Sequence, residues 1–222
     1  MSTLTLADID RDDAIGEALA GLHGTTRAAF LRRAALGSAA LVAASAAPAE
    51  ARPDRRDEAI LNYALTLEYV QDSFYSEVER LGSLSGKLAD QARIVGGHER
   101  AHVIALRKVL GSRAVKRPRF HFRGATEDPA RFRRTAVAFE DLAVAAYKGQ
   151  APLIEDRAYL VPALAIHAVE ARHAAWIRRL AGVTPAEDEF DEPRSKRSTL
   201  AIVADTRFVM KAASRHKPSF TG

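Results

Sequence analysis

Two short segments of this chain carry a glutamate and a histidine three residues apart, and each lies inside a long stretch of periodic apolar residues. They are Glu99-Arg-Ala-His102 and Glu170-Ala-Arg-His173. Because residues i and i+3 share one face of an α-helix, each segment directs a carboxylate and an imidazole to the same side. Two such pairs predict two helices that contribute to one polar site.

A lone glutamate precedes each pair at nearly the same distance along the chain. Glu68 lies 31 residues before the glutamate of the first pair, and Glu140 lies 30 residues before that of the second. Tyr75 and Tyr147 each follow one of these glutamates by seven residues, which returns to almost the same helix face. The chain therefore contains the same helical hairpin twice, as a pseudo-twofold pair.

Four helices that contribute Glu, Glu-x-x-His, Glu and Glu-x-x-His supply the ligands of a dinuclear, carboxylate-bridged metal centre inside a four-helix bundle. Burying four carboxylates without partners would be very costly, and no lysine or arginine lies on these apolar stripes. Two divalent cations would cancel the four charges, whereas the alternative is that these charges face solvent. The predicted metal ligands are Glu68, Glu99, His102, Glu140, Glu170 and His173.

Six neighbouring side chains need separate predictions. Tyr75 and Tyr147 are candidates to donate hydrogen bonds to the ligands, although core aromatics with a polar tip would show the same pattern. His98 points about 100° away from Glu99, so we expect a packed or rim residue rather than a ligand. His167 lies one turn before Glu170 and is a weaker candidate for contact with a ligand. We expect Asp141 and Glu155 to be solvated.

The chain has no cysteine, which excludes disulfides, thiolate metal sites and thiol nucleophiles. Any metal site must therefore use carboxylate and imidazole, which suit iron, manganese or zinc. We expect two metal ions, with iron first and manganese or zinc as alternatives.

Residues 1–51 resemble an export leader. Residues 34–47 are fourteen small apolar residues preceded by Arg32-Arg33 and followed by small-x-small cleavage sites at 47–49 and 49–51. Residues 26–32 resemble a twin-arginine export signal in which Ala28 stands in place of the second arginine. The competing interpretation is an alanine-rich helix of the folded protein. Export predicts a periplasmic, cell-envelope or extracellular protein.

The rest of the chain predicts one all-α domain with four helices. A polar linker at 52–56 precedes them, and a long crossover at 112–128, held by Phe120 and Phe122, separates the second helix from the third. The tail at 183–222 contains a short helix near Thr199–Ala204. The four helices are predicted at 57–81, 87–110, 129–148 and 154–181, with Pro162 kinking the last one.

The charge of the chain leaves its partners open. The formal net charge is +5, and residues 52–222 alone carry 29 basic and 22 acidic side chains. Such a surface suits solubility, or contact with anionic envelope polymers, anionic lipid or nucleic acid. Export argues against nucleic acid, and a homo-oligomer stays open.

The segments 60–69 (ILNYALTLEY), 98–102 (HERAH) and 169–173 (VEARH) resemble the ferritin-like di-iron-carboxylate superfamily. The resemblance covers 57–182, with a weaker echo at 190–193, and is strongest to its exported ferritin-like domain proteins, which include plant desiccation-associated proteins. It implies an antiparallel ferritin-like bundle. It also implies that Glu68 and Glu140 are terminal ligands, that Glu99 and Glu170 bridge the metals, and that His102 and His173 each bind one metal.

The resemblance further implies oxidation of ferrous iron, or activation of oxygen or peroxide, as stress protection. The main alternative is a non-enzymatic stress protein whose metal stabilises the bundle and whose basic surface binds the envelope. The basic residues that suggest it lie in and after the crossover, at Arg113, Lys116, Arg117, Arg119, Arg123, Arg131, Arg133 and Arg134.

Overall fold

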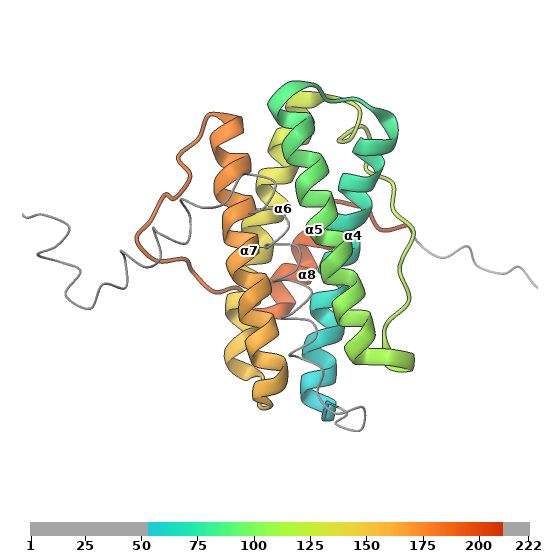
Figure 1. Cartoon of the computed structure of the whole chain (residues 1–222), viewed down its shortest axis with the longest axis vertical. Coiled ribbons are helices and arrows are strands. Elements are labelled where there is room, and N and C mark those ends of the chain that lie inside the picture. Colours follow the sequence, from blue (N-terminus) through green and yellow to red (C-terminus); the bar gives the residue numbers. More distant parts are fainter. Residues whose placement is uncertain (1–52, 211–222) are drawn as a thin grey trace, which may run out of the picture. The chain divides into compact units, whose positions relative to one another are not determined.

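The structure, a computed structural model, describes residues 53–210, and within them four long helices form two antiparallel hairpins. α4 packs on α5, and α6 packs on α7. Figure 1 shows the four helices side by side along one axis, which confirms the predicted all-α bundle. The expected leader and the last residues of the tail lie outside the described residues. The long helices are α4 (Arg55–Leu81), α5 (Gly86–Leu110), α6 (Pro129–Gln150) and α7 (Arg157–Ala181).

The first hairpin begins and ends at residues suited to helix termini. α4 starts at Arg55, inside the expected linker at 52–56, because the Asp54 carboxylate accepts a hydrogen bond from the Asp57 backbone N–H at 2.7 Å and caps the helix. It ends at Gly82, whose φ of 61° is the left-handed conformation that glycine adopts without strain. The short turn that follows leads directly into α5.

The second hairpin differs from its prediction at one end. Asp128 caps α6, with Pro129 in its first turn, as expected. After the 3₁₀ turn η2 (Ala151–Leu153), α7 begins three residues later than predicted, because Ile154 is extended and Asp156 supplies the cap. The helix then continues through Pro162, and the predicted kink stays a prediction.

The crossover runs along the outside of the bundle and joins two helices that point the same way (Figure 1). It begins with the 3₁₀ turn η1 (Gly111–Arg113). The Phe122 ring is fully buried and packs edge-on against Phe74, with their centroids 5.3 Å apart. Phe120 stacks on Phe122, which confirms that these two rings hold the crossover in place.

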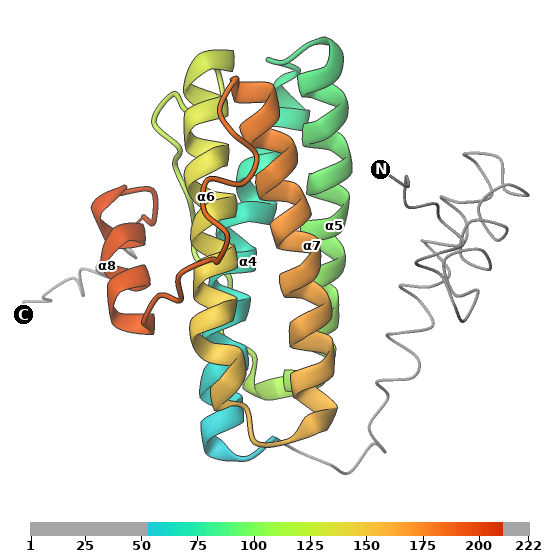
Figure 2. The same cartoon turned by 90° about the vertical axis from the view of Figure 1, so that its left-hand side faces the viewer.

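The short helix expected near Thr199–Ala204 is α8 (Lys196–Asp205), and Figure 2 shows it outside the bundle, beside α6. Val203 and the buried Thr199 face inward. After α8, Phe208 packs edge-on against Phe122 and Phe139. The tail thus covers the side of the bundle on which the crossover lies.

The core consists of two apolar clusters towards opposite ends of the bundle. Phe74 and Phe132 belong to one cluster, and Leu65 and Ile166 belong to the other. The candidate metal ligands come from the middle of each long helix, between these clusters. None of the helices in residues 53–210 combines the length and the apolar character needed to cross a bilayer.

Candidate metal centre

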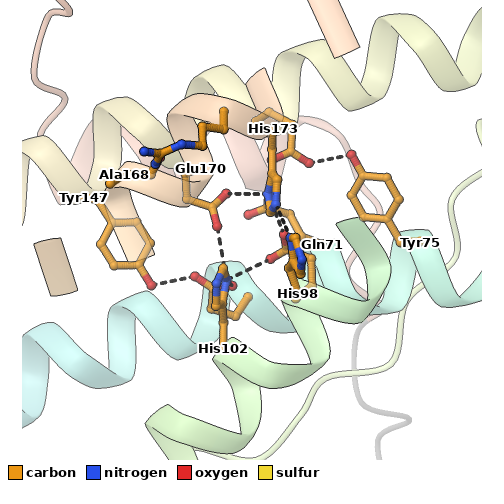
Figure 3. A network of polar contacts seen from close by, with 12 residues as sticks. Gln71, Tyr75, His98, His102, Tyr147, Ala168, Glu170 and His173 are labelled. Atoms are coloured by element: carbon orange, nitrogen blue, oxygen red, sulfur yellow. Dashed lines mark hydrogen bonds and ion pairs between the residues drawn. The ribbon is translucent and has the colours of Figure 1, made fainter. Parts of the chain in front are cut away.

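The six candidate ligands meet at the centre of the bundle. Each of the four glutamates is fully buried, His173 is 2% exposed, and the His102 side chain is 11% exposed. Figure 3 shows three of these side chains, those of His102, Glu170 and His173, pointing toward one another from α5 and α7. The ligands are Glu68 on α4, Glu99 and His102 on α5, Glu140 on α6, and Glu170 and His173 on α7.

These residues form two overlapping groups, and within each group one ligand atom per residue lies within 4.8 Å of the others. The first group, the His102 cluster, is completed by Glu68, and the second, the His173 cluster, by Glu140. Glu99 and Glu170 belong to both. Two metal positions that share two carboxylates are the arrangement of a bridged dinuclear centre.

Each imidazole presents the same ring nitrogen to its three carboxylates. His102 Nδ1 lies 3.2 Å from oxygens of Glu68 and Glu170 and 3.6 Å from Glu99. His173 Nδ1 lies 3.1 Å from Glu99, 3.5 Å from Glu140 and 3.8 Å from Glu170. In both clusters one imidazole nitrogen and three carboxylates therefore converge.

Each of the two tyrosine hydroxyls donates a hydrogen bond to a glutamate of the other hairpin. The Tyr75 hydroxyl, from the first hairpin, donates to Glu140 Oε1 of the second at 2.5 Å. The Tyr147 hydroxyl, from the second, donates to Glu68 Oε1 of the first, also at 2.5 Å. Burial and the neighbouring carboxylates raise the pKa of both phenols well above 10, so both hydroxyls keep their protons. Each tyrosine therefore holds one of the two carboxylates that belong to a single cluster, Glu140 or Glu68.

Burial and crowding perturb the ionisation of the metal-free site. Burial, with the charges of Glu170 and Glu68, raises the pKa of Glu99 well above its usual value. Burial also raises the pKa of Glu140 to about 7. Burial would raise the pKa of Glu170 too, but the charged imidazoles of His102 and His173 close to its oxygens outweigh burial and hold this pKa well below the usual range.

The carboxylates favour the protonated form of both histidines. Burial alone would lower the pKa of each imidazole, but Glu68 beside His102 and Glu140 beside His173 raise both pKa values well above 6.5. Protons on these histidines therefore partly neutralise the carboxylates of the metal-free site. A metal ion would take their place.

The donor set fits two cations. Both oxygens of Glu99, Glu170 Oε1 and His173 Nδ1 are buried without a hydrogen-bond partner. Within residues 53–210, no lysine or arginine forms an ion pair with any of the four glutamates. Unpaired buried oxygens are costly unless something binds them, and hard or intermediate cations prefer this set of carboxylate and imidazole ligands.

The sequence did not identify Gln71 as part of the site, and it predicted only part of the role of His98. Gln71 Nε2 donates to Glu140 Oε2 at 3.2 Å and to Glu170 Oε2 at 3.4 Å. It follows Glu68 by one helical turn, which is the signal that could have identified it. His98 is an exposed rim residue, as predicted, but its Nδ1 also lies 2.9 Å from Nε2 of His173.

Other polar candidates lie away from the ligands. Glu155 is exposed and pairs with Arg56, and Asp141 pairs with Arg178 at 2.7 Å. The Glu155 pair is exposed, as expected, whereas the Asp141 pair is partly buried and Asp141 is less solvated than predicted. His167 Nε2 is buried, and in the described part of the chain no hydrogen bond links this nitrogen to the six ligands.

The family model described as ferritin-like domain matches residues 56–183, which is more than half of the chain. The chain belongs to the ferritin-like domain family. No curated protein matches it. The ferritin-like match spans the four long helices, from the second residue of α4 onward, and ends before α8.

Proposed function

We propose that this ferritin-like protein binds two metal ions through Glu68, Glu99, His102, Glu140, Glu170 and His173, and that it protects against ferrous iron or peroxide by oxidation chemistry. The observation that carries the proposal is that Glu99 and Glu170 belong to both clusters. A stabilising ion needs only one closed site, whereas two ions that share ligands suit chemistry on a small oxidant. Glu68 and Glu140 would each hold one ion from the outside.

Iron is the first candidate for the bound metal, with manganese or zinc as alternatives, because the ligands are carboxylates and imidazoles. Two adjacent bound ions, when both are redox-active, supply the electrons that reduce oxygen or peroxide. The chain's own residues bury the site, hold the ligands with Tyr75 and Tyr147, and exclude bulk water.

A small cavity shares Gln71 with the site. It has a volume of about 10 Å³, lies between α4, α6 and α8, and is lined by none of the six candidate ligands. Gln71 connects it to the site, because its amide donates to Glu140 and Glu170. This volume holds roughly one water molecule. Oxygen, peroxide or a ferrous ion fits such dimensions far better than an organic substrate does.

We also propose that the protein is exported, which the leader-like residues 34–47 support. A closer relation to the exported desiccation-associated proteins is a further part of the proposal, supported by the weaker resemblance at 190–193. The alternative of a basic envelope-binding surface has less support. Five of its arginines bond to the chain itself: Arg113 to Glu58, Arg117 to Asp72, Arg123 to the Arg207 carbonyl, Arg131 to the Arg123 carbonyl, and Arg133 to the Pro129 carbonyl.

Metal loading and ferrous oxidation test the proposal together. The metal-free full chain is reconstituted with iron, manganese or zinc, and the bound metal is counted by elemental analysis. We expect two ions per chain, one for each cluster. Aerobic addition of ferrous iron should then produce ferric absorbance faster than in buffer alone.

The variant Glu99→Gln removes a charge that both clusters share, so it should reduce both the loading and the oxidation rate. Glu189→Gln, at an exposed position in the tail, is the matched control and should change neither. Fewer than two ions in the wild type would reject the dinuclear site. Two bound iron ions with a rate equal to buffer would reject the ferrous-oxidation arm, and the same result with peroxide would favour a structural metal.

A further inference from the structure

The two halves of the site are related by the repeat of the hairpin, but this relation is broken at two positions. His98 precedes Glu99, and the equivalent residue before Glu170 is Val169. Gln71 follows Glu68 by three residues, and the equivalent residue after Glu140 is Ala143. Both polar residues act on the His173 cluster, and both of their counterparts are apolar.

His98 fixes the His173 ring from the side opposite the carboxylates. Nδ1 of His173 faces Glu99, Glu140 and Glu170, so a metal would bind there and the ring proton would sit on Nε2. That nitrogen lies 2.9 Å from His98 Nδ1, which can accept the proton in a hydrogen bond. The two rings are also nearly parallel, with centroids 5.2 Å apart (Figure 3).

Gln71 fixes two carboxylates of the same cluster. Its amide nitrogen donates to one oxygen each of Glu140 and Glu170, and these are the oxygens nearest to His173 Nδ1. A carboxylate oxygen has two lone pairs, so it can accept this bond and still bind a cation. At the equivalent place in the other half, the methyl group of Ala143 can make no such bond.

We propose that the two metal positions are unequal, that the His173 cluster is the tighter one, and that His98 is a positioning residue acting through His173. The inference rests on the dinuclear site of the proposed function. Ligands held in place before binding lose less conformational freedom when the metal arrives. Outer hydrogen-bond partners of metal-binding histidines also typically change metal affinity by about 10- to 100-fold.

Titration of the metal-free full chain with Mn²⁺ tests the inequality. In the wild type, EPR should show the signal of an isolated Mn²⁺ growing up to about one equivalent and declining as the second ion couples to the first. Calorimetry should yield two binding constants. His98→Val removes one of the two differences between the halves and should weaken the tighter constant by about 10- to 100-fold, so that coupled ions appear earlier in the titration.

Three further variants separate positioning from other effects. His98→Gln retains an acceptor for His173 Nε2–H and should recover part of the lost affinity. Val169→His gives His102 the equivalent partner and should strengthen the weaker constant. His121→Val removes an exposed histidine of the crossover and should leave both constants unchanged. Circular dichroism verifies that each variant folds; His98 is exposed, so its replacement should be tolerated.

The inference is overturned if folded His98→Val keeps the tighter constant of the wild type, or weakens both constants equally. It is also overturned if His98→Gln is as weak as His98→Val, or if Val169→His leaves the weaker constant unchanged. A wild type that binds fewer than two Mn²⁺ ions rejects the proposed function itself, which is a different result from two ions bound with no response to His98.

Discussion

The hydrogen bond between Tyr75 and Glu140 permits a quantitative test on the metal-free protein. Tyr75→Phe removes one oxygen from a fully buried ring and leaves Glu140 Oε1 without its donor. A hydrogen bond to a charged group contributes about 1.5–3 kcal/mol to stability, and one between neutral groups about 0.5–1.5 kcal/mol. The cost of the substitution therefore depends on whether Glu140 is ionised.

The pKa of Glu140 decides at which pH the cost of Tyr75→Phe changes. Burial raises that pKa to about 7 in the folded protein, from a usual 4.5, so folding stability is lost as the pH rises through this interval. The Tyr75 hydroxyl lowers the pKa by stabilising the ionised form, and in Tyr75→Phe the pKa should be higher still. We therefore expect the substitution to cost about 0.5–1.5 kcal/mol at pH 5 and about 1.5–3 kcal/mol at pH 8.

Urea unfolding followed by far-UV circular dichroism, in the presence of a chelator, measures both values. Tyr69→Phe is the matched control, because Tyr69 is equally buried but its hydroxyl donates to the Val115 carbonyl, which does not titrate. The control should cost the same at both pH values. Equal costs of Tyr75→Phe at pH 5 and pH 8, or the same pH dependence in the control, would refute the reasoning.

Three further predictions concern metal and packing. Metal affinity should fall as the pH drops below about 7, because the pKa values of Glu99, Glu140 and the two histidines are raised and their bound protons must leave when a metal binds. Calorimetry in buffers of different ionisation enthalpy counts the released protons, and metal binding without proton release would contradict the prediction. A metal at 100 times its Kd should stabilise the fold by about 2.7 kcal/mol, or raise Tm by roughly 5–11 °C in a thermal scan, whereas Glu99→Gln should show a much smaller rise. Gly149→Ala should destabilise the tail, because its Cβ would overlap the Arg194 backbone; faster proteolysis near α8, with the bundle intact, is the expected result.

The bundle and the convergence of the six candidate ligands were predictable because helix periodicity relates residues within one helix. Glu99 and His102 share a face whatever surrounds them, and the caps at Asp128 and Pro129 depend only on adjacent residues. The start of α7 was less predictable, since Ile154 is extended and the cap is supplied by Asp156, two residues further along. Local patterns therefore predicted the elements and most of their ends.

Contacts between the hairpins could not be predicted in the same way. The spacing of Tyr75 from Glu68 suggests a partner within its own helix, but the hydroxyl reaches Glu140 on the other hairpin. Gln71 resembles any glutamine on an apolar stripe until α6 and α7 bring carboxylates to it. The rim position of His98 was predictable, whereas its contact with His173 depends on how α5 and α7 approach each other.

The exchange of tyrosines between hairpins has a consequence for how such a domain can be assembled. Each hairpin contains one lone glutamate, one Glu-x-x-His pair and one tyrosine, and the tyrosine finds its acceptor only on the other hairpin. Two copies of a single hairpin related by a twofold axis would supply the same six ligands and satisfy both hydroxyls. A gene half this long, encoding one hairpin that dimerises, would thus specify a complete centre, and the crossover is the segment that makes the two halves one molecule.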